Sequence, residues 1–167
     1  MDNKPEEKYK THTFPKRGKY HLRKGRYSLN RSCYFITTTT YKRCPILANS
    51  GICRILFNSL SHLEEEGRIK AICSIVMPDH IHVVFQLMEG QNLPKVMQDF
   101  KRFTAHKINK IMNRKGSVWQ EQYYDHNIRS YENLEEIIKY CHENPVRKGL
   151  VERPEDWEFW FFKEKNL

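Results

Sequence analysis

The chain has 167 residues, enough for one domain of ordinary size and too few for two cores of typical size. Its 29 Lys and Arg residues against 20 Asp and Glu give a formal net charge of +9, so a polyanion, and nucleic acid first of all, is the leading candidate partner. No apolar run approaches the roughly 20 residues of a membrane helix and no apolar leader follows Met1, so we expect a cytoplasmic protein that contacts no membrane.

The first 31 residues are predicted to form an extended basic arm. Residues 1–31 contain ten Lys or Arg residues and three acidic ones, without a sustained hydrophobic period. Tyr9, Tyr20 and Tyr27 lie among these bases and could stack on nucleobases, although a merely solvated tail is an alternative. The candidate DNA-binding residues of the arm are Arg17, Lys19, Arg23, Lys24 and Arg26.

A strand and a helix are predicted next. Residues 34–41 are rich in aromatic and β-branched residues, which favours a strand. Apolar residues recur at helical spacing over 52–63, with Asn49 or Ser50 as the N-cap and Gly67 as the stop.

The hairpin that follows carries the first candidate ligand pair. Residues 69–77 and 80–87 predict two strands joined by a Pro-Asp turn. Side chains alternate between the two faces of a strand, so His80 and His82 share one face while the apolar residues after them share the other. Two imidazoles at this spacing can bind one metal ion, and two partly exposed structural histidines are the alternative.

A long second helix with a basic face is predicted after the hairpin. Residues 95–115 contain seven bases and one acid, and the polar face of the helix is expected to lie along a phosphate backbone. The apolar stripe consists of Leu93, Val96, Met97, Phe100, Phe103, Ile108 and Ile111. The candidate DNA-binding residues of this segment are Lys95, Arg102, His106, Lys110 and Arg114.

The last elements carry the second half of the candidate site. Residues 119–129 predict a loop and a short strand, and residues 131–144 predict a third helix that Pro145 ends. Tyr140 lies off the buried stripe of this helix, and Asn144, four residues on, is placed beside it. A nucleophile and a metal ligand could thus share one turn, whereas a boundary tyrosine and a helix-stop asparagine are the alternative.

This order of elements predicts a single α+β domain with an antiparallel, ferredoxin-like sheet and helices packed on one face. We expect a folded domain over residues 32–160, preceded by the arm and followed by a C-terminal tail over 161–167. The five cysteines show none of the short paired spacings of a zinc or dithiol site, so we expect reduced structural thiols.

Three strings in this order resemble the REP-associated tyrosine transposases, which belong to the HUH single-tyrosine transposase superfamily. They are residues 77–85 (MPDHIHVVF), 118–129 (VWQEQYYDHNIR) and 140–151 (YCHENPVRKGLV), within a resemblance that runs from residue 22 to residue 157. The resemblance implies that His80 and His82 are the HUH histidines, that Tyr140 is the nucleophile and that Asn144 is the third metal ligand.

The resemblance also implies a function for the folded domain. Family members cleave and rejoin single-stranded, hairpin-associated DNA through a 5′-phosphotyrosine, with Mg²⁺ or Mn²⁺. The sequence is compatible with either a monomer or a homodimer. Tyr123 and Tyr124 are rival nucleophiles, ranked below Tyr140 because neither has a suitable partner at helical spacing.

Two classes of alternative function are compatible with the sequence. The protein could be an inactive or domesticated family member, or an RNA-recognition-like sheet, that only binds nucleic acid. A metal-dependent hydrolase that uses water is disfavoured, because no ligating carboxylates accompany the histidine pair.

Overall fold

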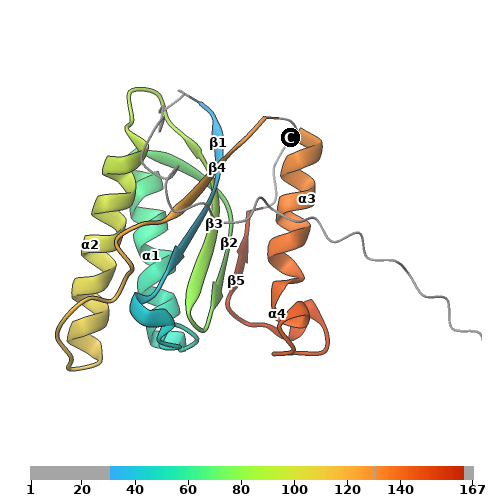
Figure 1. The fold of residues 1–167 in the computed structure, drawn as a ribbon. Coiled ribbons are helices and arrows are strands. Elements are labelled where there is room, and N and C mark those ends of the chain that lie inside the picture. The colour runs from blue at the N-terminus through green and yellow to red at the C-terminus, as the bar shows by residue number, and fades with distance from the viewer. Residues whose placement is uncertain (1–30, 130, 164–167) are drawn as a thin grey trace, which may run out of the picture.

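The computed structural model describes residues 31–129 and 131–163. The five candidate DNA-binding residues of the arm lie outside these ranges. The elements, in chain order, are β1 (Cys33–Thr39), η1 (Tyr41–Arg43), α1 (Ser50–Glu65), β2 (Ile69–Met77), β3 (His80–Leu87), α2 (Leu93–Ile111), β4 (Tyr124–Ile128), α3 (Tyr131–His142), α4 (Asn144–Arg147), η2 (Pro154–Asp156) and β5 (Trp160–Phe162) (Figure 1). No helix within the described ranges is long and apolar enough to cross a membrane.

The five strands form one antiparallel sheet in the order β4-β1-β3-β2-β5. The first four strands have the order of a ferredoxin-like fold, in which two strand–helix–strand units interleave. The prediction of a single α+β domain with an antiparallel, ferredoxin-like sheet is therefore confirmed. β5 adds an edge strand, so residues 161 and 162 of the segment assigned to the C-terminal tail belong to the sheet.

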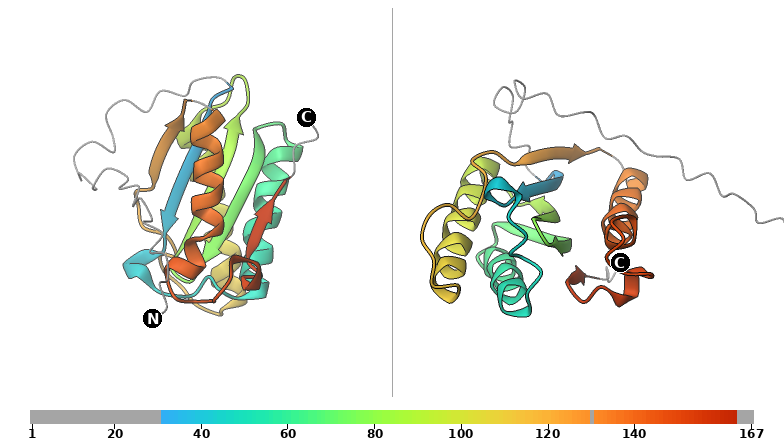
Figure 2. Two further views of the ribbon diagram at one scale, coloured as in Figure 1. Left: turned by 90° about the vertical axis from the view of Figure 1, so that its right-hand side faces the viewer. Right: turned by 60° about the horizontal axis from the view of Figure 1, so that its bottom comes forward.

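The helices cover both faces of the sheet, whereas the sequence predicted that they pack on one face. α1 and α2 lie on one face, and α3 lies on the other (Figures 1 and 2). On the α1–α2 side, Ile81, Val83 and Phe85 of β3 are buried as the strand period predicts. On the α3 side, Phe35 of β1 and Ile75 of β2 are also buried. A sheet that is apolar on both faces must be covered on both, so the third helix takes the second face.

Asparagine side chains cap the two long helices. Asn49 Oδ1 accepts hydrogen bonds from the backbone N–H groups of Gly51 and Ile52, and Asn92 Oδ1 accepts one from that of Lys95. Each cap satisfies N–H groups that the first turn of a helix leaves unpaired. The start of α1 is thereby fixed at Asn49, one of the two caps that the sequence predicts.

The buried stripe of α2 is narrower than predicted. Phe103 and Ile111 are 46% and 58% exposed, whereas Thr104 is fully buried. The Thr104 hydroxyl donates to the carbonyl of Phe100 and accepts a 2.9 Å hydrogen bond from the indole of Trp119. The buried hydrogen bond between the Trp119 indole and the Thr104 hydroxyl thus attaches the segment before β4 to α2, which gives Trp119 a structural role.

Candidate active site

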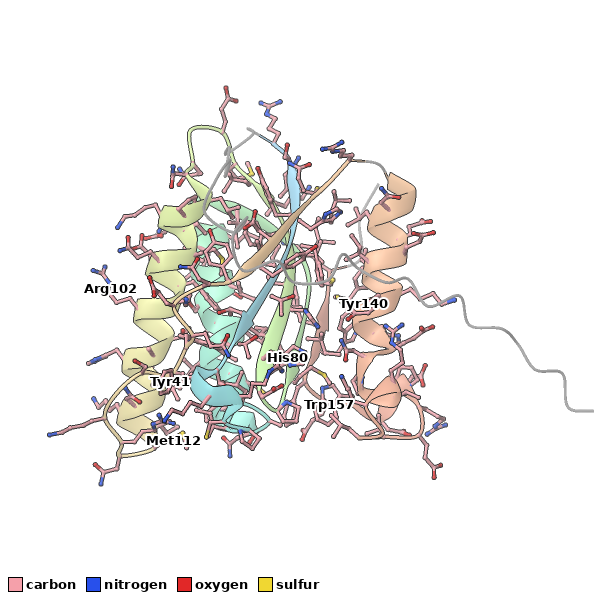
Figure 3. All side chains as sticks on the ribbon, in the orientation of Figure 1. Tyr41, His80, Arg102, Met112, Tyr140 and Trp157 are labelled. Carbon is pink, nitrogen blue, oxygen red and sulfur yellow. The ribbon has the colours of Figure 1, made fainter. Side chains whose placement is uncertain are left out.

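The two candidate ligand histidines lie on the face of the sheet that α3 covers. Antiparallel pairing places His82 of β3 opposite Thr37 of β1, and Thr37 opposite Tyr124 of β4. The ring centroids of His80 and His82 are 4.7 Å apart, as alternate positions on a strand allow. Figure 3 shows His80 on the sheet and Tyr140 on the neighbouring α3.

Hydrogen bonds define the protonation of His82. Its Nε2 lies 3.0 Å from Asn144 Nδ2, and its Nδ1 lies 2.8 Å from the Thr37 hydroxyl oxygen. With the amide in this orientation its nitrogen donates to Nε2, which corresponds to the neutral tautomer with its proton on Nδ1. Burial, followed by the charge of His80, holds the pKa of His82 well below its usual value. A neutral imidazole is the form that binds metal ions.

His80 is oriented by a carboxylate. Its Nδ1 lies 2.6 Å from Oδ1 of Asp79, and Arg43 donates to Oδ2 of Asp79 at 2.8 Å. Burial lowers the pKa of His80, although the Asp79 carboxylate acts in the opposite direction. Burial alone would raise the pKa of Asp79, but the hydrogen bonds from His80 and Arg43 outweigh it and the pKa is lowered. With Nδ1 bound to a carboxylate, Nε2 is the His80 nitrogen that can bind a metal.

Arg43 reaches Asp79 from a left-handed turn. Lys42 and Arg43 of η1 have φ angles of 53° and 56°, a region that residues other than glycine rarely adopt. The Thr40 hydroxyl lies within donor distance of the carbonyl oxygen of Cys44, which follows this turn, and of that of Asp79, in the turn between β2 and β3. Sequence reasoning missed Arg43 because it lies 36 residues from Asp79 and no local pattern signals the turn.

α3 and α4 bring Tyr140 and Asn144 to His82. α3 ends at His142, as Pro145 predicts, and Asn144 begins a separate short helix. Asn144 is 3% exposed, and its Nδ2 lies 3.0 Å from His82 Nε2. The ring centroids of Tyr140 and His82 are 5.8 Å apart. Asn144 and His82, 62 residues apart in the sequence, therefore meet in one site with Tyr140.

Arg147 lies against the candidate nucleophile. Its guanidinium carbon is 4.2 Å from the ring centroid of Tyr140, and its Nη2 donates to the Tyr140 carbonyl. Burial raises the pKa of Tyr140, while the charge of Arg147 and the hydrogen bond with Asn144 act to lower it. Because the net shift is upward, the phenol is protonated at neutral pH and must lose its proton during any attack.

Three bases close to the site were not among the predicted DNA-binding residues. Arg43 faces Asp79, while Arg147 and Lys148 depress the pKa of His82 through their charge. Arg147 follows Tyr140 by seven residues, about two turns of a continuous helix, which would place both side chains on one face. The sequence did not indicate this contact because the helix is interrupted between α3 and α4.

The predicted basic face of α2 lies across the sheet from the histidines. Figure 3 shows Arg102 and Tyr140 on opposite sides of the molecule. The side chains of Lys95 and Arg102 lie 2.9 and 3.6 Å from the carboxylate of Asp99, while His106 and Lys110 are exposed. These bases can therefore contact DNA only at a distance from Tyr140.

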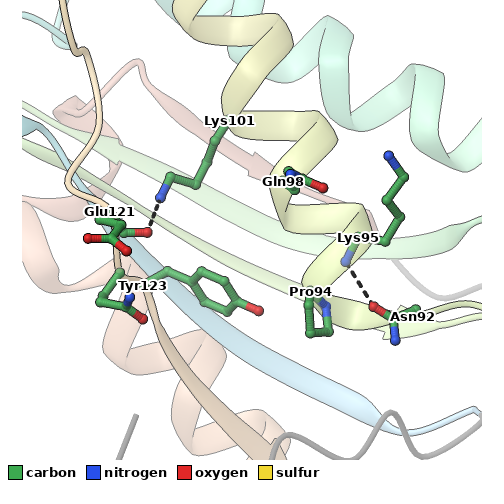
Figure 4. Close-up of a pocket in the computed structure, with 8 residues that line it drawn as sticks. Asn92, Pro94, Lys95, Gln98, Lys101, Glu121 and Tyr123 are labelled. Atoms are coloured by element: carbon green, nitrogen blue, oxygen red, sulfur yellow. Dashed lines mark hydrogen bonds between the residues drawn. The ribbon is translucent and has the colours of Figure 1, made fainter. Parts of the chain in front are cut away.

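A pocket of about 510 Å³ lies between the start of α2 and the loop that leads into β4 (Figure 4). Lys95, Gln98 and Tyr123 are among its lining residues. Lys101 also lines the pocket and donates to the Glu121 carbonyl at 2.8 Å. The pocket lies on the α2 side of the sheet, separate from the histidine pair.

The ligand chemistry of the site fits a divalent metal ion bound through neutral groups. Within the described ranges, no three His, Cys, Asp or Glu side chains form a group that could hold a metal. The candidate ligands are instead two imidazoles, His80 and His82, and the carboxamide of Asn144. Such donors suit Mn²⁺ better than Mg²⁺ and leave the charge of the ion uncompensated.

Known proteins with related sequences are transposases. A protein of Haemophilus influenzae, provisionally named a REP-associated tyrosine transposase, is 31% identical over 108 residues, which span 55% of this chain and 57% of that protein. The REP-associated tyrosine transposase of Escherichia coli is 23% identical over 138 residues, 82% of this chain and 80% of the relative. A solved REP-associated tyrosine transposase bound to a REP hairpin has a TM-score of 0.70, with 22% identity over 81% of this chain and 79% of that one.

The ferredoxin-like sheet, the histidine pair and the adjacent tyrosine are the features of the HUH class that the sequence resembles. A family model described as "Transposase IS200 like" matches residues 28–144, and the chain belongs to this family. The resemblance to REP-associated tyrosine transposases is confirmed by the related proteins.

Proposed function

We propose that the protein cleaves and rejoins single-stranded DNA through a covalent bond between Tyr140 and a 5′-phosphate. The observation that carries this proposal is the contact of Asn144 with the His82 imidazole, whose ring centroid lies 5.8 Å from that of Tyr140. This arrangement supports a site in which the candidate nucleophile and the candidate metal ligands come from one chain.

The reaction exchanges one phosphoester bond for another. The Tyr140 oxygen forms a bond to phosphorus, and the bond between phosphorus and the O3′ oxygen breaks. The phenol loses its proton and the leaving O3′ oxygen gains one, which leaves a 5′-phosphotyrosine and a free 3′-hydroxyl. A second 3′-hydroxyl can reverse the step, because the energy of the phosphodiester is conserved in the phosphotyrosine. Strand transfer then requires no nucleotide cofactor.

The residues around Tyr140 have complementary roles in this proposal. Arg147 and Lys148 supply positive charge for the phosphate, and Arg147 also holds the tyrosine ring. His80, His82 and Asn144 would hold Mg²⁺ or Mn²⁺, which when bound supplies charge stabilisation at the phosphate. Asp79 and Thr37 orient the two imidazoles by binding their Nδ1 atoms.

The proposed substrate is single-stranded DNA that carries a hairpin. The solved relative with this fold is bound to a REP hairpin. α2 lies on the face of the sheet opposite α3, which carries Tyr140, so we assign the exposed bases of α2 and the basic arm to the hairpin or flanking backbone.

The test is formation of a covalent adduct. Incubation with a labelled single-stranded hairpin oligonucleotide and Mn²⁺ or Mg²⁺ should give a protein–DNA band on a denaturing gel. Tyr140→Phe should abolish the band, because it removes only the attacking oxygen, whereas the matched variant Tyr124→Phe should retain it. Absence of a wild-type adduct, with binding intact, would instead support the DNA-binding role.

A further inference from the structure

A second aromatic residue lies in the same cross-strand row as His82. Pairing across three strands sets Tyr124 of β4, Thr37 of β1 and His82 of β3 side by side, with their side chains on one face. Two strand spacings separate Tyr124 from His82, about 10 Å. A nucleic-acid strand that leaves the site across Thr37 would therefore pass over Tyr124.

The surface along this row is accessible and its aromatic ring is supported. Tyr124 and Thr37 are both half-buried, so part of each side chain is accessible. The Tyr124 ring packs edge-to-face on Phe35, with 6.3 Å between centroids, and Phe35 contacts Tyr140 in the same manner at 6.1 Å. A ring held by packing loses little conformational freedom when it binds a ligand.

β4 is an edge strand of the described sheet, and four of its five residues are half-buried. Because successive side chains point to opposite faces of a sheet, the adjacent Tyr123 and Tyr124 lie on opposite faces at the start of β4. Tyr123 belongs to the core on the α1–α2 side and is 7% exposed, whereas Tyr124 packs against the cluster on the α3 side. Only Tyr124 therefore shares a face with the histidine pair.

We propose that Tyr124 is a stacking site for a nucleobase close to the scissile phosphate, a role that rests on the proposed function. An aromatic ring on a sheet face next to a backbone-binding site is a general way to hold single-stranded nucleic acid, because every base has a π-face. Tyr124 thus acts in substrate binding, while Tyr140 carries the chemistry.

The test measures the affinity for single-stranded hairpin oligonucleotides in the full-length Tyr140→Phe background, so that no strand is cleaved. Adding Tyr124→Ala should weaken binding about 5- to 100-fold, and Tyr124→Phe should restore it because the ring is kept. Phe162→Ala is the matched control, since Phe162 is an exposed aromatic residue on β5, at the opposite edge of the described sheet from β4, and should leave the affinity unchanged.

An abasic scan of the oligonucleotide identifies the stacked base. One abasic position near the scissile phosphate should weaken binding to the protein that retains Tyr124, and the same position should have no further effect in Tyr124→Ala. The stacking site would be overturned if Tyr124→Ala bound DNA as tightly as the protein that retains Tyr124, or if the losses of affinity from Tyr124→Ala and from the abasic site were additive at every position. Neither result would affect adduct formation at Tyr140. Stacking without an adduct from the wild-type protein would overturn strand transfer alone.

Discussion

His82 is held between Thr37 and Asn144 as a neutral imidazole, and none of the three candidate metal ligands carries a negative charge. A site of this kind binds Mg²⁺ or Mn²⁺ weakly by itself, because hard divalent ions prefer anionic oxygen ligands. A DNA phosphate at the site would supply the missing charge. The metal and the DNA are therefore expected to bind cooperatively.

We predict that a single-stranded hairpin oligonucleotide raises the affinity for Mn²⁺ roughly 5- to 150-fold, the usual range for coupled sites. Isothermal calorimetry on the Tyr140→Phe variant, with and without oligonucleotide, measures this coupling without cleavage. His82→Ala serves as the control and should lose the coupling. Equal Mn²⁺ affinity in the two titrations would show that phosphate does not complete the ligand set.

At this scale the sequence predicted those contacts that follow from local periodicity. The alternation of a strand places His80 beside His82, and the spacing of a helix brings Asn144 near Tyr140, even though α3 breaks before Asn144. The contact between Arg43 and Asp79 could not be predicted, because it depends on a left-handed turn and on the pairing of β1 with β3.

At the scale of elements, Asp99 joins α2 to the turn between α1 and β2. Its carboxylate accepts hydrogen bonds from Lys95 at 2.9 Å and from Arg68 at 3.1 Å. The hydrogen bond from Lys95, together with that from Arg68, holds the pKa of Asp99 below its ordinary value. A lowered folded-state pKa stabilises the protein above the unfolded pKa of about 3.9, and this stabilisation is lost as the pH falls through the folded value.

We predict that Asp99→Asn lowers the free energy of unfolding at neutral pH by less than about 1 kcal/mol, because the pair is partly exposed and screened by solvent. The difference from the wild type should shrink as the pH falls below the unfolded pKa of about 3.9, and should vanish once the wild-type carboxyl is also protonated in the folded protein. Urea unfolding of both proteins at several pH values measures this difference in the free energy of unfolding. A difference that is independent of pH would mean that Asp99 acts through packing rather than charge.

The position of α3 shows where sequence reasoning fell short at this scale. The clear alternation of β3 suggested one apolar face, and all helices were assigned to it. β2, in contrast, is buried at eight of its nine positions, which is the pattern of a strand covered on both faces. A strand that is apolar on both faces predicts helices on both faces of the sheet, and therefore predicts α3 on the face that carries the histidine pair.

At the scale of the whole molecule, the net charge of +9 separates into parts with different expected roles. Arg147 and Lys148 lie near His82, with Arg147 against Tyr140, and are proposed to bind the reacting phosphate, whereas the bases of α2 lie across the sheet and two of them lie close to Asp99. The basic arm lies outside the described residues, so its contact with DNA stays a prediction.

We predict that the arm contributes most of the salt dependence of DNA binding. Each phosphate contact with single-stranded DNA adds about 0.7 to the slope of log K against log salt, so neutralising five contacting bases lowers it by up to about 3.5. The variant replaces Arg17, Lys19, Arg23, Lys24 and Arg26 with Ala. The matched variant, in which the five α2 candidates are replaced, should lower the slope less, and an unchanged slope in the arm variant would show that the arm does not contact DNA.

The most direct test of the account is the location of the covalent bond. The adduct formed with a single-stranded hairpin oligonucleotide and Mn²⁺ is digested with protease and nuclease, and the peptide that retains a nucleotide is sequenced by mass spectrometry. We predict a nucleotide linked through its 5′-phosphate to Tyr140. A nucleotide on Tyr124, or a cleaved strand with no modified tyrosine, would contradict the assignment of Tyr140 as the nucleophile.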